Sequence, residues 1–138
     1  MIIDGKDSVL GRLATFAAKS ALEGEKVEIV NADDIVIIGN KNSILKKYLE
    51  RRRIGTMSKG PFFPRDTKGI VRRAIRGMLK NKRYHGREAF KNVKVFEGLP
   101  DELKEKEMVQ VAKIRVDRPI HRVKIGELAN ILKERSKA

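Results

Sequence analysis

Cysteine is absent from the 138 residues of the sequence. This absence excludes a disulfide framework, thiolate zinc or iron–sulfur ligation and a cysteine nucleophile. The only two histidines, His85 and His121, are too far apart in the sequence to suggest a metal pair. We therefore predict no metal site and no cofactor, and we interpret both imidazoles as surface or hydrogen-bonding groups.

Long apolar runs are also missing. No segment approaches the roughly 18–20 apolar residues that span a bilayer, and residues 1–8 lack the basic start and apolar core of a secretion signal. Hydrophobic residues make up 41% of the chain, which is enough to build a core and excludes a wholly disordered basic tail. We predict a soluble, unexported, cytoplasmic protein without a membrane partner, and a single domain over residues 1–138.

Acidic residues are scarce in the middle of the chain. Residues 41–94 hold 18 of the 32 lysines and arginines but only 3 of the 18 aspartates and glutamates, which gives this segment a net charge of +15. Residues 1–40 carry −3 and residues 95–138 carry +2, so the total of +14 comes from one stretch. Segregation of this kind predicts contact with a polyanion.

Catalytic and nucleotide-binding motifs are absent as well. The sequence has neither a P-loop nor a G-x-G-x-x-G pattern, and the turn at Gly39–Lys41 is interpreted either as structural or as a backbone contact to RNA. A metal-dependent nuclease would need clustered carboxylates, yet the basic segment offers only Glu50, Asp66 and Glu88. We predict no catalytic residue. A DNA-compacting or regulatory protein stays an alternative, because a basic surface alone does not distinguish RNA from DNA.

The first third of the chain alternates strand and helix patterns. Apolar residues at helical spacing predict a helix that starts after a cap at Asp7 or Ser8 and stops at Gly24. Strands are expected at 1–4, 27–31 and 35–38, and the continuous apolar run of the last is typical of a strand buried on both faces of a parallel sheet. This order predicts a βαβ unit and the α/β class.

Two amphipathic helices are predicted in the basic segment. The first covers 43–53, with Ile44, Leu45, Tyr48 and Leu49 in one stripe. The second runs through 70–80 after a cap at Asp66 or Thr67, with an apolar half that includes Met78. Its opposite side carries four cations and no acid, unlike a solvated face that mixes both signs. These cations are Arg72, Arg73, Arg76 and Lys80.

The loop over 54–64 joins these helices and contains Phe62 and Phe63 beside Lys59. The rings could stack on unpaired bases, or one or both could pack back onto the domain. Further along, we expect an edge or half-buried strand at 93–96, an exposed helix or turn at 101–107 and a strand at 109–116. Apolar residues at helical spacing predict a final short helix. They are Ile125, Leu128, Ala129 and Leu132.

Several blocks of the sequence, in the right order, resemble one family. They are Val9–Thr15, Val30–Ala32, Gly39–Lys41, Gly60–Pro61, Arg65, Arg73–Leu79, Gly86 and Val93–Gly98. Together they resemble the universal large-subunit ribosomal protein family L-thirteen, in its archaeal-like form. The Ile-Arg-Gly-Met-Leu stretch, with a glycine seven residues after Leu79, is the most specific part of the match.

The resemblance implies a fold and a function. The fold is a small, mostly parallel sheet flanked by helices, in α/β/α layers, with a basic loop and helix extension. The function is that of a structural, non-catalytic protein that binds and stabilises large-subunit ribosomal RNA beside neighbouring ribosomal proteins. We expect no obligate homo-oligomer. Lys80 stands where the family often has proline, so the helix could continue into Asn81, and Thr67 also replaces a frequent proline.

The RNA-binding residues that we predict are the cations of the basic segment, with arginine favoured for bidentate phosphate contacts. They are Lys41, Lys46, Lys47, Arg51, Arg52, Arg53, Lys59, Arg65, Lys68, Arg72, Arg73, Arg76, Lys80, Lys82, Arg83 and Arg87.

Overall fold

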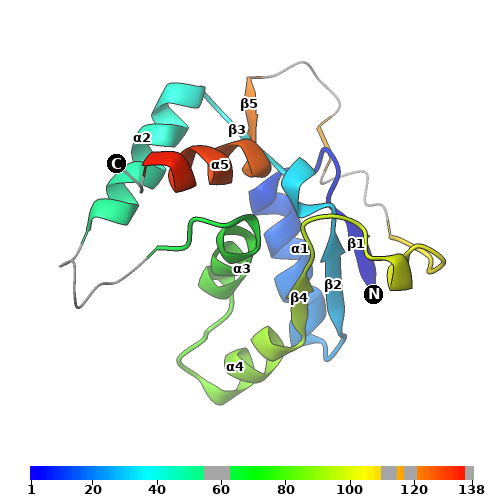
Figure 1. The fold of residues 1–138 in the computed structure, drawn as a ribbon. Helices are drawn as coiled ribbons and strands as arrows, with labels where there is room; N and C mark the ends of the chain where they lie inside the picture. Colours follow the sequence, from blue (N-terminus) through cyan, green and yellow to red (C-terminus); the bar gives the residue numbers. More distant parts are fainter. Residues whose placement is uncertain (55–62, 110–114, 117–120, 136–138) are drawn as a thin grey trace.

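A computed structural model of the chain describes residues 1–54, 63–109, 115–116 and 121–135 (Figure 1). The elements of these ranges are, in chain order, β1 (Ile2–Asp4), α1 (Leu10–Leu22), β2 (Val27–Val30), η1 (Ala32–Asp34), β3 (Val36–Ile38), α2 (Lys41–Arg53), α3 (Thr67–Met78), α4 (Tyr84–Lys91), β4 (Val93–Val95), η2 (Asp101–Leu103), β5 (Arg122–Lys124) and α5 (Ile125–Arg135), where η marks a 3-10 helix.

The strands form two small sheets. β1, β2 and β4 make a three-stranded parallel sheet in that order, and β3 pairs with β5 in an antiparallel two-stranded sheet. β1 and β2 are neighbours joined through α1, which is the predicted βαβ unit. The α/β class with a mostly parallel sheet is therefore confirmed, and β4 is an edge strand as expected.

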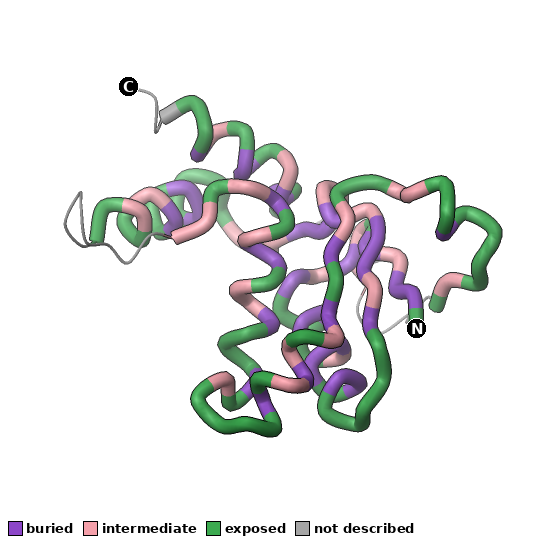
Figure 2. The backbone as a smooth tube through the Cα atoms, turned by 60° about the horizontal axis from the view of Figure 1, so that its bottom comes forward, coloured by how far each residue is buried: buried purple, intermediate pink, exposed green. Residues whose placement is uncertain are grey.

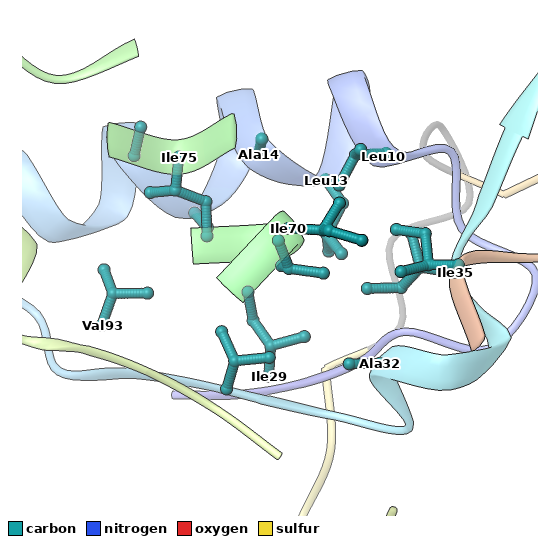
Figure 3. Packing of buried hydrophobic residues seen from close by; sticks show 14 of the residues in the cluster. Leu10, Leu13, Ala14, Ile29, Ala32, Ile35, Ile70, Ile75 and Val93 are labelled. Carbon is teal, nitrogen blue, oxygen red and sulfur yellow. The ribbon is translucent and has the colours of Figure 1, made fainter. Parts of the chain in front are cut away.

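Successive side chains along the strands point to opposite faces of the parallel sheet, and this divides the core into two clusters. Ile3, Ile29 and Val93 point to one face, where they join residues of α1 and α3 in a large apolar cluster (Figure 3). Ile2 and Val30 belong to a second, smaller cluster with Leu103 of η2. The α-helices α1, α3 and α4 thus cover one face of the sheet, and a 3-10 helix with its neighbouring loop covers the other. Figure 2 shows the buried residues gathered where these layers meet.

Helix α1 ends as predicted but begins differently. Gly24 has a left-handed φ of 94°, and the N–H groups of Gly24 and Glu25 donate to carbonyls of the last turn. At the other end, the cap is Val9, with no side-chain hydrogen bond, so the prediction of a cap at Asp7 or Ser8 was wrong. Asp7 instead adopts a left-handed φ of 58° and its N–H donates to the Asp34 carbonyl, so this residue belongs to the turn before the helix.

The expectation of a parallel strand at 35–38 buried on both faces was also wrong. β3 runs antiparallel to β5, outside the parallel sheet, and Ile38 at its end is 38% exposed. An apolar run does not specify its partner strand, because parallel pairing depends on segments far away in the sequence. The C-terminal helix α5 was predicted correctly. Its stripe of Ile125, Leu128, Ala129 and Leu132 is buried in the main cluster.

Helix α3 does not continue into Asn81. It ends at Met78, and the buried Leu79 has extended backbone angles, after which a turn leads into α4, a helix that the sequence patterns had not indicated. Gly86 of α4 explains the turn. A Cβ placed there would lie 2.2 Å from the Lys80 carbonyl oxygen, so only glycine lets α4 approach the end of α3 this closely.

The structure describes only part of the remaining segments for which the sequence predicted helix, turn or strand. The 101–107 region is short helix and turn, as expected, although Leu103 is buried. Of the strand predicted at 109–116, residues 110–114 lie outside the described ranges. Val109 forms a parallel bridge with Ile3, and the Arg115 guanidinium lies 3.3 Å from the Asp4 carboxylate.

Candidate nucleic-acid interface

Helix α2 presents a basic surface because its apolar residues lie on one side only. It begins two residues earlier than predicted, after Asn40, whose side chain accepts a hydrogen bond from the Asn42 N–H at 2.9 Å. Ile44, Leu45 and Tyr48 are buried. The predicted cations are therefore left on the outer side, where Lys46, Lys47, Arg51 and Arg53 are exposed.

The Gly39–Lys41 turn thus has a structural role as the cap of α2. Lys41, at the start of this helix, is directed toward α5, and its ammonium group lies 3.7 Å from a carboxylate oxygen of Glu127. Both side chains are more than half exposed, so the pair contributes little to stability. Lys41 is accordingly directed toward α5 and not toward the outer side of α2.

Phe63 connects the basic surfaces of α2 and α3. The Arg51 guanidinium lies 5.6 Å from the centre of the Phe63 ring, and the Arg73 guanidinium lies 5.7 Å from it. Arg52 donates a hydrogen bond to the Phe63 carbonyl oxygen. Phe63 therefore packs back onto the domain, which was one of the two interpretations of the loop. Phe62 and Lys59 lie outside the described residues.

Tyr48 forms the buried base of this arrangement. The Arg51 guanidinium also lies 5.3 Å from the centre of the Tyr48 ring. Burial raises the pKa of the Tyr48 hydroxyl above its ordinary value, and the nearby positive charge of Arg51 opposes this rise. A tyrosine hydroxyl with the ordinary pKa of about 10 is already neutral near pH 7, and the rise keeps it neutral at higher pH.

Helix α3 carries the clearest separation of apolar and basic residues. Ile70, Val71 and Ile75 are buried in the main cluster, whereas Arg72 and Arg76 are exposed. The cap residue is Asp66, without a side-chain hydrogen bond, and the buried Thr67 donates its hydroxyl to the Asp33 carboxylate at 2.7 Å. Thr67 thus anchors the start of α3 to η1, which fixes the direction of the basic side.

A groove of about 560 Å³ lies between α3, the end of α4 and β4. Its cations are Lys68, Arg72, Lys91 and Lys94, and its acidic residue is Asp66. The Arg72 guanidinium lies 4.6 Å from the centre of the Phe90 ring of α4, which holds the arginine at the groove. Lys91 and Lys94 were not among the predicted binding residues, although the run of positive charge in the sequence extends as far as Lys94.

The turn between α3 and α4 adds further exposed cations. Lys80, Lys82 and Arg83 of the turn and Arg87 of the following α4 are all exposed, and the Arg83 N–H donates to the Lys80 carbonyl oxygen at 2.9 Å. Arg65 is also exposed, in the stretch that enters α3. The described cations therefore fall into three neighbouring groups, on α2, on α3 and on the α3–α4 turn, and Phe63 links the first two.

Within the described ranges, no group of three or more histidine or carboxylate side chains is arranged to hold a metal ion. Every helix described is too short or too polar to cross a bilayer. The charged surface is suited to electrostatic and hydrogen-bonding contact with phosphate, since guanidinium groups can bind phosphate oxygens in a bidentate manner.

The chain is similar to known proteins over most of its length. The model of the family "Ribosomal protein L13" matches residues 1–102. "Large ribosomal subunit protein uL13" of Methanosphaera stadtmanae is 40% identical over 135 residues, 95% of each chain. The protein of the same name from Methanosarcina barkeri is 45% identical over 112 residues, 80% of each chain. The one from Methanopyrus kandleri is 40% identical over 135 residues, 95% of this chain and 85% of its own.

These relatives are archaeal, in agreement with the form that the sequence blocks resemble. The family match covers well over half of the chain, and the relatives extend the similarity nearly to its end. The chain belongs to the ribosomal protein L13 family, which the sequence resemblance had predicted.

Proposed function

We propose that the exposed cations of α2, α3 and the α3–α4 turn bind large-subunit ribosomal RNA. As a member of its family, the chain is a structural constituent of the large ribosomal subunit and not an enzyme, and its place in the cell is the ribosome. The family assignment leaves the DNA-compacting protein and the nuclease without support.

The observation that carries this proposal is the one-sided basic surface of α3. Arg72 and Arg76 are exposed on the side opposite the buried Ile70 and Ile75, and no acidic residue lies between Thr67 and Met78. Like charges gathered in this way repel one another in water. A polyanion removes that repulsion and releases its own counterions on binding.

The mode of contact follows from the shape of RNA. An A-form duplex hides its major groove from side chains, so proteins contact its phosphates, its 2′-hydroxyls and its unpaired bases. The cations here are spread over two helices and a turn. We infer that the protein neutralises phosphates where RNA segments converge, with arginine supplying bidentate contacts.

The other parts of the chain contribute differently. Residues 1–40 and 95–138 are close to neutral and supply much of the core, and we propose that neighbouring ribosomal proteins contact these flanks. The apolar cluster that contains both Ile3 and Leu132 supports a single domain.

The test of this proposal is a charge-matched pair of variants. The double variant Arg72→Gln with Arg76→Gln removes two charges from α3, and Lys104→Gln with Lys106→Gln removes two from the exposed segment after η2. Each protein is titrated with transcribed large-subunit ribosomal RNA in a filter-binding assay and is then tested for co-sedimentation with large subunits. We expect the α3 variant to bind at least tenfold more weakly and the other to bind nearly as wild type. Equal losses in both would refute the assignment of the surface.

A further inference from the structure

A partly apolar hollow lies beside the α3–α4 turn. It has a volume of about 340 Å³ and is lined by Leu22, Met78, Lys80, Arg83, His85 and Gly86. It differs from the basic groove beside β4, because two exposed apolar side chains form one wall. Neither the phosphate contacts proposed above nor the packing of the core requires this wall.

The apolar wall comes from the ends of two helices that pack together. Leu22, the last residue of α1, is 38% exposed, and Met78, the last residue of α3, is 44% exposed. The sequence pattern had placed Met78 in the apolar half of its helix, but its exposure sets it apart from the buried Ile75. The Thr15 hydroxyl lies 3.4 Å from the Met78 sulfur, which helps to hold this side chain at the surface.

The rim of the hollow is positively charged and fixed in shape. Lys80 and Arg83 are exposed cations, His85 is exposed beside them, and the hollow has no carboxylate among its described lining residues. The close contact of Gly86 with the Lys80 backbone and the hydrogen bond from the Arg83 N–H to the Lys80 carbonyl set the path of the turn. A preformed site of this kind loses little conformational entropy when a ligand binds.

We propose that this hollow binds one unstacked base of ribosomal RNA, a proposal that rests on the RNA-binding function proposed above. The face of the base contacts Leu22 and Met78, and Lys80 and Arg83 bind the phosphates on either side. A base is flat and apolar on its faces and lies between two negative charges, which matches an apolar wall with a cationic rim. An apolar side chain of a partner protein would contact the apolar wall but would make no ion pair with Lys80 or Arg83.

Continuity with the basic surface of α3 favours RNA as the occupant. Met78 is two residues after Arg76 in the same helix, and Lys80 is two residues beyond the helix end. An RNA strand that contacts Arg76 therefore reaches the hollow within a short distance along its backbone. Specific RNA recognition often uses bases splayed out of loops and bulges, which are the bases free to enter such a site.

The experiment uses the methyl groups of methionine as reporters. The chain has four methionines, and ¹³C-methyl labelling of the full-length protein gives each its own NMR signal, with Met78 assigned from the variant Met78→Leu. The labelled protein is titrated with single-stranded RNA trinucleotides of each base, and with ribose 5-phosphate as a probe that has the charge but no base. We expect the trinucleotides to shift the Met78 methyl proton signal upfield, because the methyl group lies over the ring current of the base. The methyl signals of Met1 and Met108 should not shift.

A second measurement compares two variants in their binding of transcribed large-subunit ribosomal RNA. Met78→Ala removes part of the wall and is expected to weaken binding about tenfold, because the base then buries less apolar side-chain surface. Tyr84→Ala removes an exposed ring that is adjacent in the sequence but does not line the hollow, and it should bind as wild type. Circular dichroism confirms that both variants are folded.

Two results would overturn the base site. One is a Met78 methyl signal that the trinucleotides leave unmoved, or that ribose 5-phosphate moves equally. The other is equal RNA affinity of Met78→Ala and wild type. Either result together with weak binding by the α3 arginine variant would leave the proposed function standing. If the arginine variant also binds normally, the proposed function fails as well.

Discussion

The ring of Phe63 lies edge-to-face against the ring of Tyr48, with 5.6 Å between the ring centres. Tyr48 is buried in α2, and Phe63 belongs to the stretch that enters α3. Because Arg51 and Arg73 both lie over the Phe63 ring, this aromatic pair fixes cations from two helices relative to each other. The basic surface is thus positioned by apolar contacts beneath it.

Replacement of this ring should therefore weaken RNA binding without removing a charge. We expect Phe63→Leu to lower the free energy of unfolding by about 1–2 kcal/mol, from the loss of the aromatic pair and of two cation–π contacts. Affinity for ribosomal RNA should fall several-fold, because the Phe63 ring no longer holds the guanidinium groups of Arg51 and Arg73 in position. Urea denaturation and filter binding measure the two effects. Phe63→Tyr keeps the ring and serves as the control, and full RNA affinity in Phe63→Leu would contradict the account.

A partly buried side-chain hydrogen bond joins the start of α3 to η1. Thr67→Val keeps the shape of the side chain but removes the hydroxyl that donates to Asp33. We expect a loss of about 1.5–3 kcal/mol in the free energy of unfolding, because a carboxylate loses a buried donor. Thr67→Ser retains the hydroxyl and should lose less than half as much. A larger loss in Thr67→Ser than in Thr67→Val would mean that the methyl group, and not the hydrogen bond, anchors the helix.

The two helices on either side of the α3–α4 turn differ in their need for glycine, because α4 requires it at Gly86 and α3 tolerates a side chain at Gly77. Gly86→Ala places a methyl group against the Lys80 backbone and should destabilise the protein by about 2 kcal/mol or more. Gly77→Ala meets no atom within 4 Å and should stabilise α3 by up to about 1 kcal/mol. Thermal unfolding of both variants tests this pair. A Gly86→Ala protein as stable as wild type would show that α4 does not approach Lys80 so closely.

The Tyr48 hydroxyl makes stability depend on alkaline pH. Its pKa is raised in the folded protein, whereas the unfolded chain ionises near the ordinary value of about 10. Below that pH both states keep the proton. Above it the unfolded state loses the proton first, so the free energy of unfolding falls as pH rises through the folded pKa.

The Tyr84→Phe variant leaves Tyr48 as the only tyrosine, and its phenolate absorbance then reports this pKa directly. We expect a native midpoint above 10 and an ordinary midpoint in denaturant. Arg51→Gln should raise the native midpoint further, because the guanidinium opposes the rise. A native midpoint below that of the denatured chain would contradict the burial of Tyr48.

The sequence predicted those parts of the fold that depend on local pattern. The apolar stripe from Ile125 to Leu132 and the stop at Gly24 are examples, because helical spacing and a left-handed glycine act within a few residues. The antiparallel pairing of β3 and the short α4 were missed. The pairing of β3 depends on a strand that is distant in the sequence, β5. The short α4 depends on the close approach of Gly86 to the Lys80 backbone, which apolar spacing does not indicate.

The sequence predicted which residues give the candidate site its positive charge, but it did not predict how those residues are arranged. The cations of α2 and α3 lie on exposed surfaces, as the stripes indicated, but the place of Phe63 between Arg51 and Arg73 depends on how a loop folds back. Lys91 and Lys94 join Lys68 only because α4 and β4 pack beside α3. No spacing in the sequence indicates that contact.

If many cations of residues 41–94 neutralise phosphates of ribosomal RNA, binding must weaken steeply with salt, and this salt dependence is the most direct test. The dissociation constant for transcribed large-subunit ribosomal RNA is measured from about 50 to 200 mM salt. With about eight phosphate contacts, the logarithm of the association constant should fall against the logarithm of the salt concentration with a slope of roughly −6 to −7, and Arg72→Gln should reduce that slope by about 1. A wild-type slope near −1 would contradict the claim.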